Sequence, residues 1–265
     1  MSTTLRFLGA AGFEITAPES RILIDPFLSE NPLAPVSHDE LARPDVILVT
    51  HAAPDHFGDT AAIALRTGAP VICGGDVRVH LLDRGVPAEQ IQATIWGVVT
   101  RAGGVVVRPV ECHHWSMAPR LDGSFITGTP LAYIVEPEPG LRIYHYGDTS
   151  IFDMRLIGEL YRPNVGLLGC TQPVEVEDHS GAGEELTGEM TPDEAARVAE
   201  MLGVDVAVAC HYLSPNDDLD AFVEQVNFHD STGRRVAVAP AIGSTLTLAV
   251  GSDGRAAIQA TEPIV

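Results

Sequence analysis

Histidine and aspartate residues gather at four places in the sequence, each directly after an apolar segment. The apolar segments VILVT, VVVRPVEC, LRIYHYG and VAVAC predict buried strands, and open sheets place ligand sites at the carboxyl ends of their strands. Imidazole and carboxylate groups together suit zinc, manganese or iron, whereas calcium takes oxygen ligands alone. The sequence therefore predicts a transition-metal site formed by His51, Asp55, His56, His114, Asp148 and His211.

Each place has an ordinary structural explanation when it is taken alone. The segment HAAPDHFGD could be a polar turn, and the Gly-Asp pair at Asp148 is common in turns. His114 could pack beside Trp115, and His211 could be a core histidine. The convergence of all four strand ends on the same kind of chemistry favours the metal site.

The elements that must position these residues alternate along the chain. Strand-like segments dominate the first 50 residues, and mixed strands and helices follow. Thr191 and Glu194 form a capping-box pattern at the start of the predicted helix 192–202. No linker divides the chain, so we expect a single α/β (α+β) layered domain spanning residues 1–265. The other predicted helices cover 59–67, 75–84 and 217–227.

The composition excludes several classes of partner. The formal net charge is −20, with 36 acidic residues against 16 basic ones, all of them arginine. Such a surface repels phosphate backbones and anionic lipids, so we expect neither a nucleic-acid nor a membrane partner. We find no secretory signal or 18-residue apolar run, and we expect a soluble, cytoplasmic protein. Reduced, buried thiols are expected for Cys73, Cys112, Cys170 and Cys210, which show no CxxC spacing.

The site residues, in this order, resemble a known signature. The metallo-β-lactamase superfamily carries HxHxDHxxD, then a distant His, a bridging Asp and a last His; here His114 lies in CHHWS, Asp148 in YGDT and His211 in ACHY. The phrases RILIDPF, MTPDEAARVAEMLG and VAPAIGSTLTL are similar to the branch containing ascorbate-6-phosphate lactonase. HHWS is also similar to the QHWS of N-acylphosphatidylethanolamine phospholipase D. The resemblance implies a four-layer αββα sandwich.

The resemblance also implies a role for each site residue. His51 and His114 would hold one metal, while Asp55, His56 and His211 would hold the other and Asp148 would bridge them. Asp59 would orient a ligand imidazole through its other ring nitrogen, and Asp25 would support the site from beneath. The expected cofactors are one or two divalent ions, zinc or manganese.

The sequence departs from the signature at Ala53, where the family has its second His. Three ligands remain for the first metal, which is still the ordinary protein ligand count of a catalytic zinc site. If one ion binds, we place it at the other site, which keeps Asp55, His56, Asp148 and His211. Two spare histidines could compensate: His113, beside His114, and His179, in the polar stretch 172–189. Neighbouring residues on a strand point to opposite faces, so His113 could ligate only where the strand ends.

The implied activity is hydrolysis. A metal at this site would lower the pKa of bound water from near 16 to about 7, and the resulting hydroxide would attack a small ester, lactone or amide. Asp55 would orient the water and relay its proton, and His113 or His145 could protonate the leaving group. Two alternatives are a phosphodiesterase of the same fold and a non-catalytic binding protein in which Ala53 marks the lost function. The expected partner is a small-molecule substrate, and a homo-oligomer is left open.

Overall fold

The computed structural model describes residues 2–171 and 188–263. Most of their strands belong to two large sheets. The first sheet contains β1 (Thr3–Gly9), β2 (Gly12–Ala17), β3 (Ser20–Ile24), β4 (Val46–Leu48), β5 (Val71–Cys73), β6 (Ile91–Ala93), β16 (Thr245–Val250) and β17 (Ala256–Glu262). Their hydrogen-bonded order is β17-β16-β1-β2-β3-β4-β5-β6, and the pairs from β3 to β6 are parallel.

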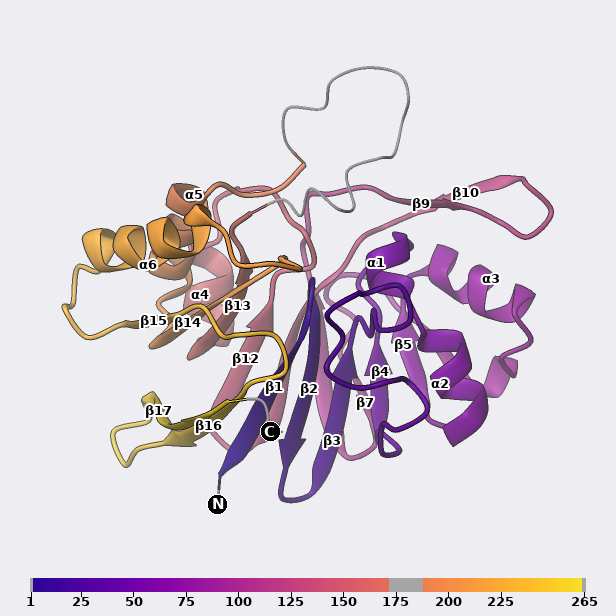
Figure 1. Ribbon diagram of the computed structural model, residues 1–265, viewed down its shortest axis with the longest axis horizontal. Coiled ribbons are helices and arrows are strands. Elements are labelled where there is room, and N and C mark those ends of the chain that lie inside the picture. The colour runs from indigo at the N-terminus through magenta and orange to yellow at the C-terminus, as the bar shows by residue number, and fades with distance from the viewer. Residues whose placement is uncertain (1, 172–187, 264–265) are drawn as a thin grey trace.

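The second sheet faces the first. It contains β7 (Thr100–Ala102), β8 (Val105–Val110), β11 (Ala132–Glu138), β12 (Leu141–His145), β13 (Val165–Gly169), β14 (Val206–Cys210) and β15 (Val236–Val238). Their order is β15-β14-β13-β12-β11-β8-β7, and β12 to β15 are parallel. A separate hairpin of β9 (Ser116–Pro119) and β10 (Phe125–Gly128) extends beyond the sheets (Figure 1).

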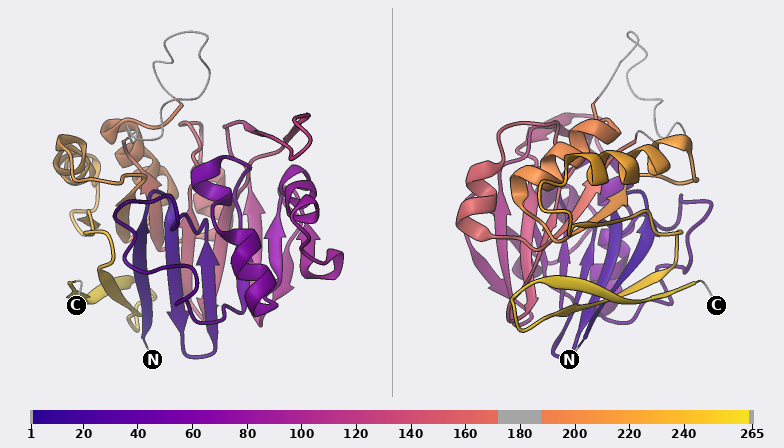
Figure 2. Two further views of the ribbon diagram at one scale, coloured as in Figure 1. Left: turned by 45° about the vertical axis from the view of Figure 1, so that its right-hand side comes forward. Right: turned by 90° about the vertical axis from the view of Figure 1, so that its left-hand side faces the viewer.

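Helices cover the outer faces of both sheets (Figures 1 and 2). Beside the first sheet lie α1 (Pro54–Phe57), α2 (Thr60–Thr67), α3 (Gly75–Asp83) and the 3-10 turn η1 (Ala88–Gln90). Beside the second lie α4 (Arg155–Tyr161), α5 (Pro192–Leu202) and α6 (Asp217–His229). The predicted capping box is present: the Thr191 side chain accepts from the Glu194 backbone, and Glu194 bonds back to the Thr191 N–H. The layered α/β prediction, with a sheet pair between helices, is confirmed.

The central strands are apolar on both faces because both faces are covered. In β3, Ile22 and Ile24 enter the core between the two sheets, while Leu23 packs outward in the cluster that contains α2 and α3 residues. The same alternation places Leu48 inward and Ile47 outward in β4. This period-2 pattern fixes which way each strand faces, and therefore where each strand end delivers the next side chain.

Two further features bear on the sequence analysis. The four cysteines are free and buried, as predicted. In the part of the chain that the structure describes, no helix has both the length and the apolar character that a bilayer crossing requires.

Candidate metal centre

The predicted ligands meet at one edge of the two sheets. His51 follows β4, and the short helix α1 supplies Asp55 and His56. Asp148 follows β12 and His211 follows β14. Because β4, β12 and β14 lie in the parallel parts of their sheets, their carboxyl ends can share one edge. His114 reaches the same place from the segment between β8 and β9.

Two overlapping groups have ligand atoms within 4.8 Å of one another: Asp55, His56, Asp148 and His211 in one, and His51, His114 and Asp148 in the other. Asp148 is common to both. Its Oδ2 lies 2.7 Å from His56 Nε2, 3.3 Å from His211 Nε2 and 3.7 Å from His51 Nε2. Asp55 Oδ2 lies 3.4 Å from both His56 Nε2 and His211 Nε2. All of these side chains are buried except His114, which is partly exposed.

The unpaired ring nitrogens show that this cluster fits a metal. The Nε2 atoms of His51, His56 and His211 and Oδ1 of Asp148 are buried, and none has a hydrogen-bond partner among the described residues. The contact of His56 with Asp148 is short but lacks hydrogen-bond geometry. Buried polar atoms without partners are costly, and aiming several of them at one point is how a protein prepares cation ligands. The residues therefore fit a divalent ion.

Charge inside the cluster is balanced between the carboxylates and the imidazoles. Burial disfavours every charged form, yet His56 and His211 hold the pKa values of Asp55 and Asp148 below the ordinary range. Burial alone would lower the pKa values of His56 and His211. The neighbouring carboxylates outweigh this effect and raise both pKa values well above normal. Burial and neighbouring His56 lower the pKa of His51. The acidic side of the site thus stays ionised, as cation ligands must be.

A floor beneath the site fixes the orientation of two imidazoles. His56 Nδ1 lies 2.7 Å from Asp25 Oδ2. Thr50 donates its backbone N–H to Asp25 Oδ1 (2.9 Å) and its hydroxyl to Oδ2 (2.7 Å), and Thr50 Oγ1 is 3.0 Å from His51 Nδ1. With Nδ1 turned to this floor, Nε2 of each ring faces the cluster. The expectation that Asp25 supports the site from beneath agrees with this geometry.

Backbone strain is concentrated at the same place. Asp25, Asp148 and His211 adopt φ values of +43°, +63° and +69°. Residues other than glycine rarely adopt this left-handed region, and it costs about 1–3 kcal/mol each. Gly147, directly before Asp148, also has a positive φ, and a Cβ there would overlap the Leu131 carbonyl oxygen. The glycine of the GDT segment is therefore required by close backbone approach.

Glu189 is a site residue that the sequence interpretation missed. Its carboxylate is buried, its Oε2 lies 3.8 Å from His211 Nδ1, and Tyr146 donates its hydroxyl to the same oxygen (3.3 Å). The Thr171 carbonyl oxygen lies 3.3 Å from the same His211 nitrogen. The Thr171 carbonyl oxygen therefore holds His211 Nδ1, and the Glu189 carboxyl group lies beside that nitrogen, beyond hydrogen-bond distance. The only signal in the sequence was its place at the end of the acidic stretch 172–189.

Ser116 ties the loop from His51 to Asp55 to helix α3. The Ala52 backbone N–H donates to Ser116 Oγ (3.0 Å), and the Ser116 hydroxyl donates to Asp76 Oδ2. Both side chains are buried. Ala53 is the N-cap residue of α1 in extended conformation, so the position of the missing family His directly precedes the helix that carries Asp55 and His56.

Three predicted roles need correction. Asp59 does not touch a ligand imidazole in the described structure: its carboxylate accepts from the Leu28 and Ser29 backbones and from the Ser29 hydroxyl. His113 belongs to neither ligand group: its Nε2 lies 2.8 Å from Glu111 Oε1, and its ring stacks on Phe152.

His145 is fully buried, with Nε2 2.8 Å from the Ala11 carbonyl oxygen, so it lies in the core rather than beside a leaving group. The remaining candidate, His179, lies outside the described residues.

The fold and this donor set define a metal-dependent hydrolase of the metallo-β-lactamase fold. A family model described as the beta-lactamase superfamily domain matches residues 20–212. The solved structure of Igni18, a metallo hydrolase from Ignicoccus hospitalis, aligns with a TM-score of 0.73 at 26% identity, covering 95% of this chain and all of that one. An isothiocyanate hydrolase from Delia radicum gut bacteria shares the fold, with a TM-score of 0.65 at 18% identity over 91% of this chain and 97% of that one.

Sequence relatives narrow the class. A UPF0173 metal-dependent hydrolase from Rubrobacter xylanophilus is 39% identical over 213 residues, which cover 79% of this chain and 81% of the relative. One from Methanopyrus kandleri is 39% identical over 210 residues, covering 78% and 83%. The chain therefore belongs to the UPF0173 metal-dependent hydrolases of the β-lactamase superfamily.

Proposed function

We propose that this hydrolase is lactonase-like and cleaves a small ester, lactone or amide. The observation that carries the proposal is the set of buried Nε2 atoms, together with Asp148 Oδ1, that converge at the sheet edge without a hydrogen-bond partner among the described residues. One or two divalent ions, zinc or manganese, would be held by the two groups that share Asp148. When bound, such an ion supplies Lewis acidity and lowers the pKa of water to about 7.

The residues of the chain have separate tasks in this proposal. Asp55 keeps its carboxylate ionised between His56 and His211, so it can accept a hydrogen bond from the attacking water and orient it. Asp25 holds the ring of His56 in place, and the Thr171 carbonyl oxygen holds the ring of His211. Burial of the cluster excludes bulk water, which strengthens each of these interactions.

The mouth of the site favours an uncharged substrate. A pocket of about 480 Å³ is lined by His113, His114, Trp115, Ser150, Gly188, Glu189 and Glu194. Trp115 stacks on His114, with ring centroids 5.0 Å apart, and is 47% exposed, so it offers an apolar wall. Of the two acidic residues, Glu194 would repel a phosphodiester, whereas burial raises the pKa of Glu189 well above its usual range and favours its neutral form. These features support the ester, lactone or amide over the phosphodiesterase alternative.

We further propose a cytoplasmic location and a small-molecule partner rather than nucleic acid or a membrane. The support is indirect: four buried free thiols suit a reducing compartment, and a net charge of −20 repels polyanions.

The test is activity of the zinc- or manganese-reconstituted protein against a panel of lactones, esters, amides and phosphodiesters. His56→Ala and His211→Ala should each abolish turnover, whereas His38→Ala, which removes a histidine outside the cluster, should leave it unchanged. Less than about half a metal ion per chain after reconstitution, or wild-type rates in His56→Ala, would contradict the proposal.

A further inference from the structure

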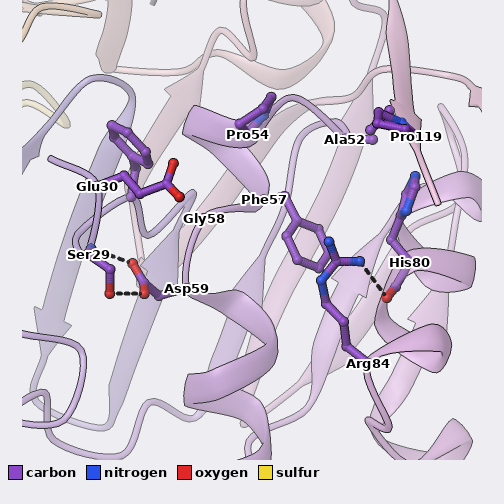
Figure 3. A pocket seen from close by; sticks show the side chains of 12 residues that line it. Ser29, Glu30, Ala52, Pro54, Phe57, Gly58, Asp59, His80, Arg84 and Pro119 are labelled. Carbon is purple, nitrogen blue, oxygen red and sulfur yellow. Dashed lines mark hydrogen bonds between the residues drawn. The ribbon is translucent and has the colours of Figure 1, made fainter. Parts of the chain in front are cut away.

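A second pocket lies beside α1, and none of its lining residues belongs to the two metal-binding groups. Its volume is about 270 Å³, enough for a small organic molecule. The rings of Phe27, Pro54 and Phe57 give it an apolar interior, and Arg84 and His80 of the α3 region form one wall (Figure 3). The pocket therefore combines an apolar interior with the guanidinium of Arg84, in a strongly acidic protein.

Arg84 presents its guanidinium to this pocket with most of its donors unused. The guanidinium carbon lies 4.7 Å from the centroid of the Phe57 ring, and Nη1 donates to the His80 carbonyl oxygen at 3.2 Å. Within residues 2–171 and 188–263, no carboxylate lies within ion-pair distance of Arg84. A guanidinium has five N–H donors in a fork that matches a carboxylate. The stacking on Phe57 holds that fork in place at little entropic cost.

His80 supplies a second, independent polar group. It lies one helical turn before Arg84 on the same face of the helix. The residue is 2% exposed, it lines the pocket, and its Nε2 has no hydrogen-bond partner in the described structure. Figure 3 shows its ring directed toward Ala52 and Pro119 at the upper end of the pocket. A buried ring nitrogen without a partner is costly unless a ligand or water completes it.

The acidic groups around the pocket limit the charge of the ligand. Both oxygens of Asp59 are already engaged by Leu28 and Ser29. Glu30 lines the side opposite Arg84 (Figure 3). A single negative charge directed at Arg84 avoids Glu30, whereas a dianion such as phosphate would be repelled by it. The pocket thus favours a monocarboxylate with an apolar body.

We propose that this pocket binds a small aromatic or aliphatic monocarboxylate, with the carboxylate on Arg84, its apolar body against Phe57 and Phe27, and the ring nitrogen of His80 as a further polar contact. Ala52 and Pro54, which line the same pocket, belong to the loop between His51 and Asp55. The ligand would therefore lie directly against the loop that carries the metal ligands, without contacting the metal ligands themselves.

The experiment is titration of the metal-loaded, ¹⁵N-labelled protein with benzoate. Calorimetry measures the binding affinity, and the shifts of the Gly58 and Ala118 backbone amides report binding at the pocket. Benzamide serves as the uncharged analogue and inorganic phosphate as the competing anion. Arg84→Gln removes the proposed partner at an exposed side chain. Arg78→Gln is the matched control, because it removes the same charge from the same helix outside the pocket.

The expected result is that benzoate shifts the Gly58 and Ala118 amides and that Arg84→Gln weakens its binding about ten- to hundred-fold, while Arg78→Gln leaves it unchanged. Benzamide should bind more weakly than benzoate. The proposal is overturned if wild-type protein shows no shift at these amides, if Arg78→Gln weakens binding as much as Arg84→Gln, or if phosphate binds more tightly than benzoate. His211→Ala should retain the amide shifts, and their loss would assign the binding to the metal centre instead.

Discussion

His56 Nδ1 lies 2.7 Å from Asp25 Oδ2, in the floor beneath the metal-binding groups. This contact directs the opposite ring nitrogen, Nε2, toward Asp55 and Asp148. A carboxylate behind a ligand imidazole fixes the ring orientation and raises its basicity. We therefore expect Asp25 to contribute to metal affinity although it lies outside both ligand groups.

Asp25→Asn should lower metal affinity about 10- to 100-fold, because the amide no longer offers a charged acceptor to Nδ1. Asparagine is the appropriate substitute since it tolerates the left-handed backbone at φ +43°. The measurement is competition for zinc against a chromophoric chelator. Asp59→Asn is the control, because its carboxylate binds the Leu28–Ser29 turn rather than an imidazole. Equal affinities in Asp25→Asn and wild type would show that the floor contact is not needed.

The sequence was sufficient to predict which strand ends bring the candidate ligands together, but it could not predict the direction of each side chain. His51, Asp148 and His211 follow buried apolar strands, and this pattern can be recognised from the sequence alone. Asp59 lies three residues after His56, close enough in sequence to suggest contact, yet Gly58 turns the chain with φ +40° and sends Asp59 to the Ser29 turn.

Glu189 was missed for a different reason. Glu189 reaches His211 only because its segment packs against the end of β14, 22 residues later in the chain. No local sequence pattern encodes such packing. His113 was left open for a similar reason. Strand alternation could exclude it only if the strand continued, but β8 ends at Val110, and the contacts with Glu111 and Phe152 that place its ring depend on tertiary packing.

Ser116→Ala should destabilise the fold by about 1–3 kcal/mol, because it leaves the buried carboxylate of Asp76 without its donor and the Ala52 N–H without its acceptor. Urea unfolding of the metal-free protein measures the change. Ser124→Ala, at the exposed tip of the β9–β10 hairpin, is the matched control. A loss within about 0.5 kcal/mol of wild type would mean that the Asp76–Ser116–Ala52 connection carries no net stability.

Ala53→His should restore the family's second imidazole. The residue is partly exposed, has extended backbone geometry and precedes α1, so the larger side chain can be accommodated without rearranging the helix. We expect metal content to rise by about one ion per chain, because the group of His51, His114 and Asp148 would gain a fourth ligand. Elemental analysis gives the stoichiometry, with Ala62→His on the exposed face of α2 as the control. Unchanged metal content would show that position 53 does not face the group of His51, His114 and Asp148. Lower activity together with higher metal content would show that the substrate uses the space beside Ala53.

Asp230 provides a test of stability against pH away from the metal centre. Its carboxylate follows α6 and accepts from Thr232 N (2.9 Å), Thr232 Oγ1 (2.7 Å) and Arg235 N (2.7 Å). Burial opposes ionisation, but the Arg235 and Thr232 hydrogen bonds outweigh it and hold the pKa of Asp230 well below its ordinary value. A lowered pKa contributes stability that is present above the unfolded-state pKa of about 3.9 and is lost as the pH falls toward the folded-state pKa.

Asp230→Asn should therefore cost about 1–2 kcal/mol of unfolding free energy at pH 7, and the difference from wild type should shrink as the pH falls below about 4. Urea unfolding at pH 7, 5 and 3 measures the difference, and Asp253→Asn, in an exposed turn where the carboxylate accepts from Arg255 N, is the control. A cost that stays constant between pH 7 and pH 3 would show that the side chain acts through shape rather than charge. A cost that vanishes on acidification would assign the stability to the ionised carboxylate, because the neutral acid and the amide then offer the backbone donors comparable oxygens.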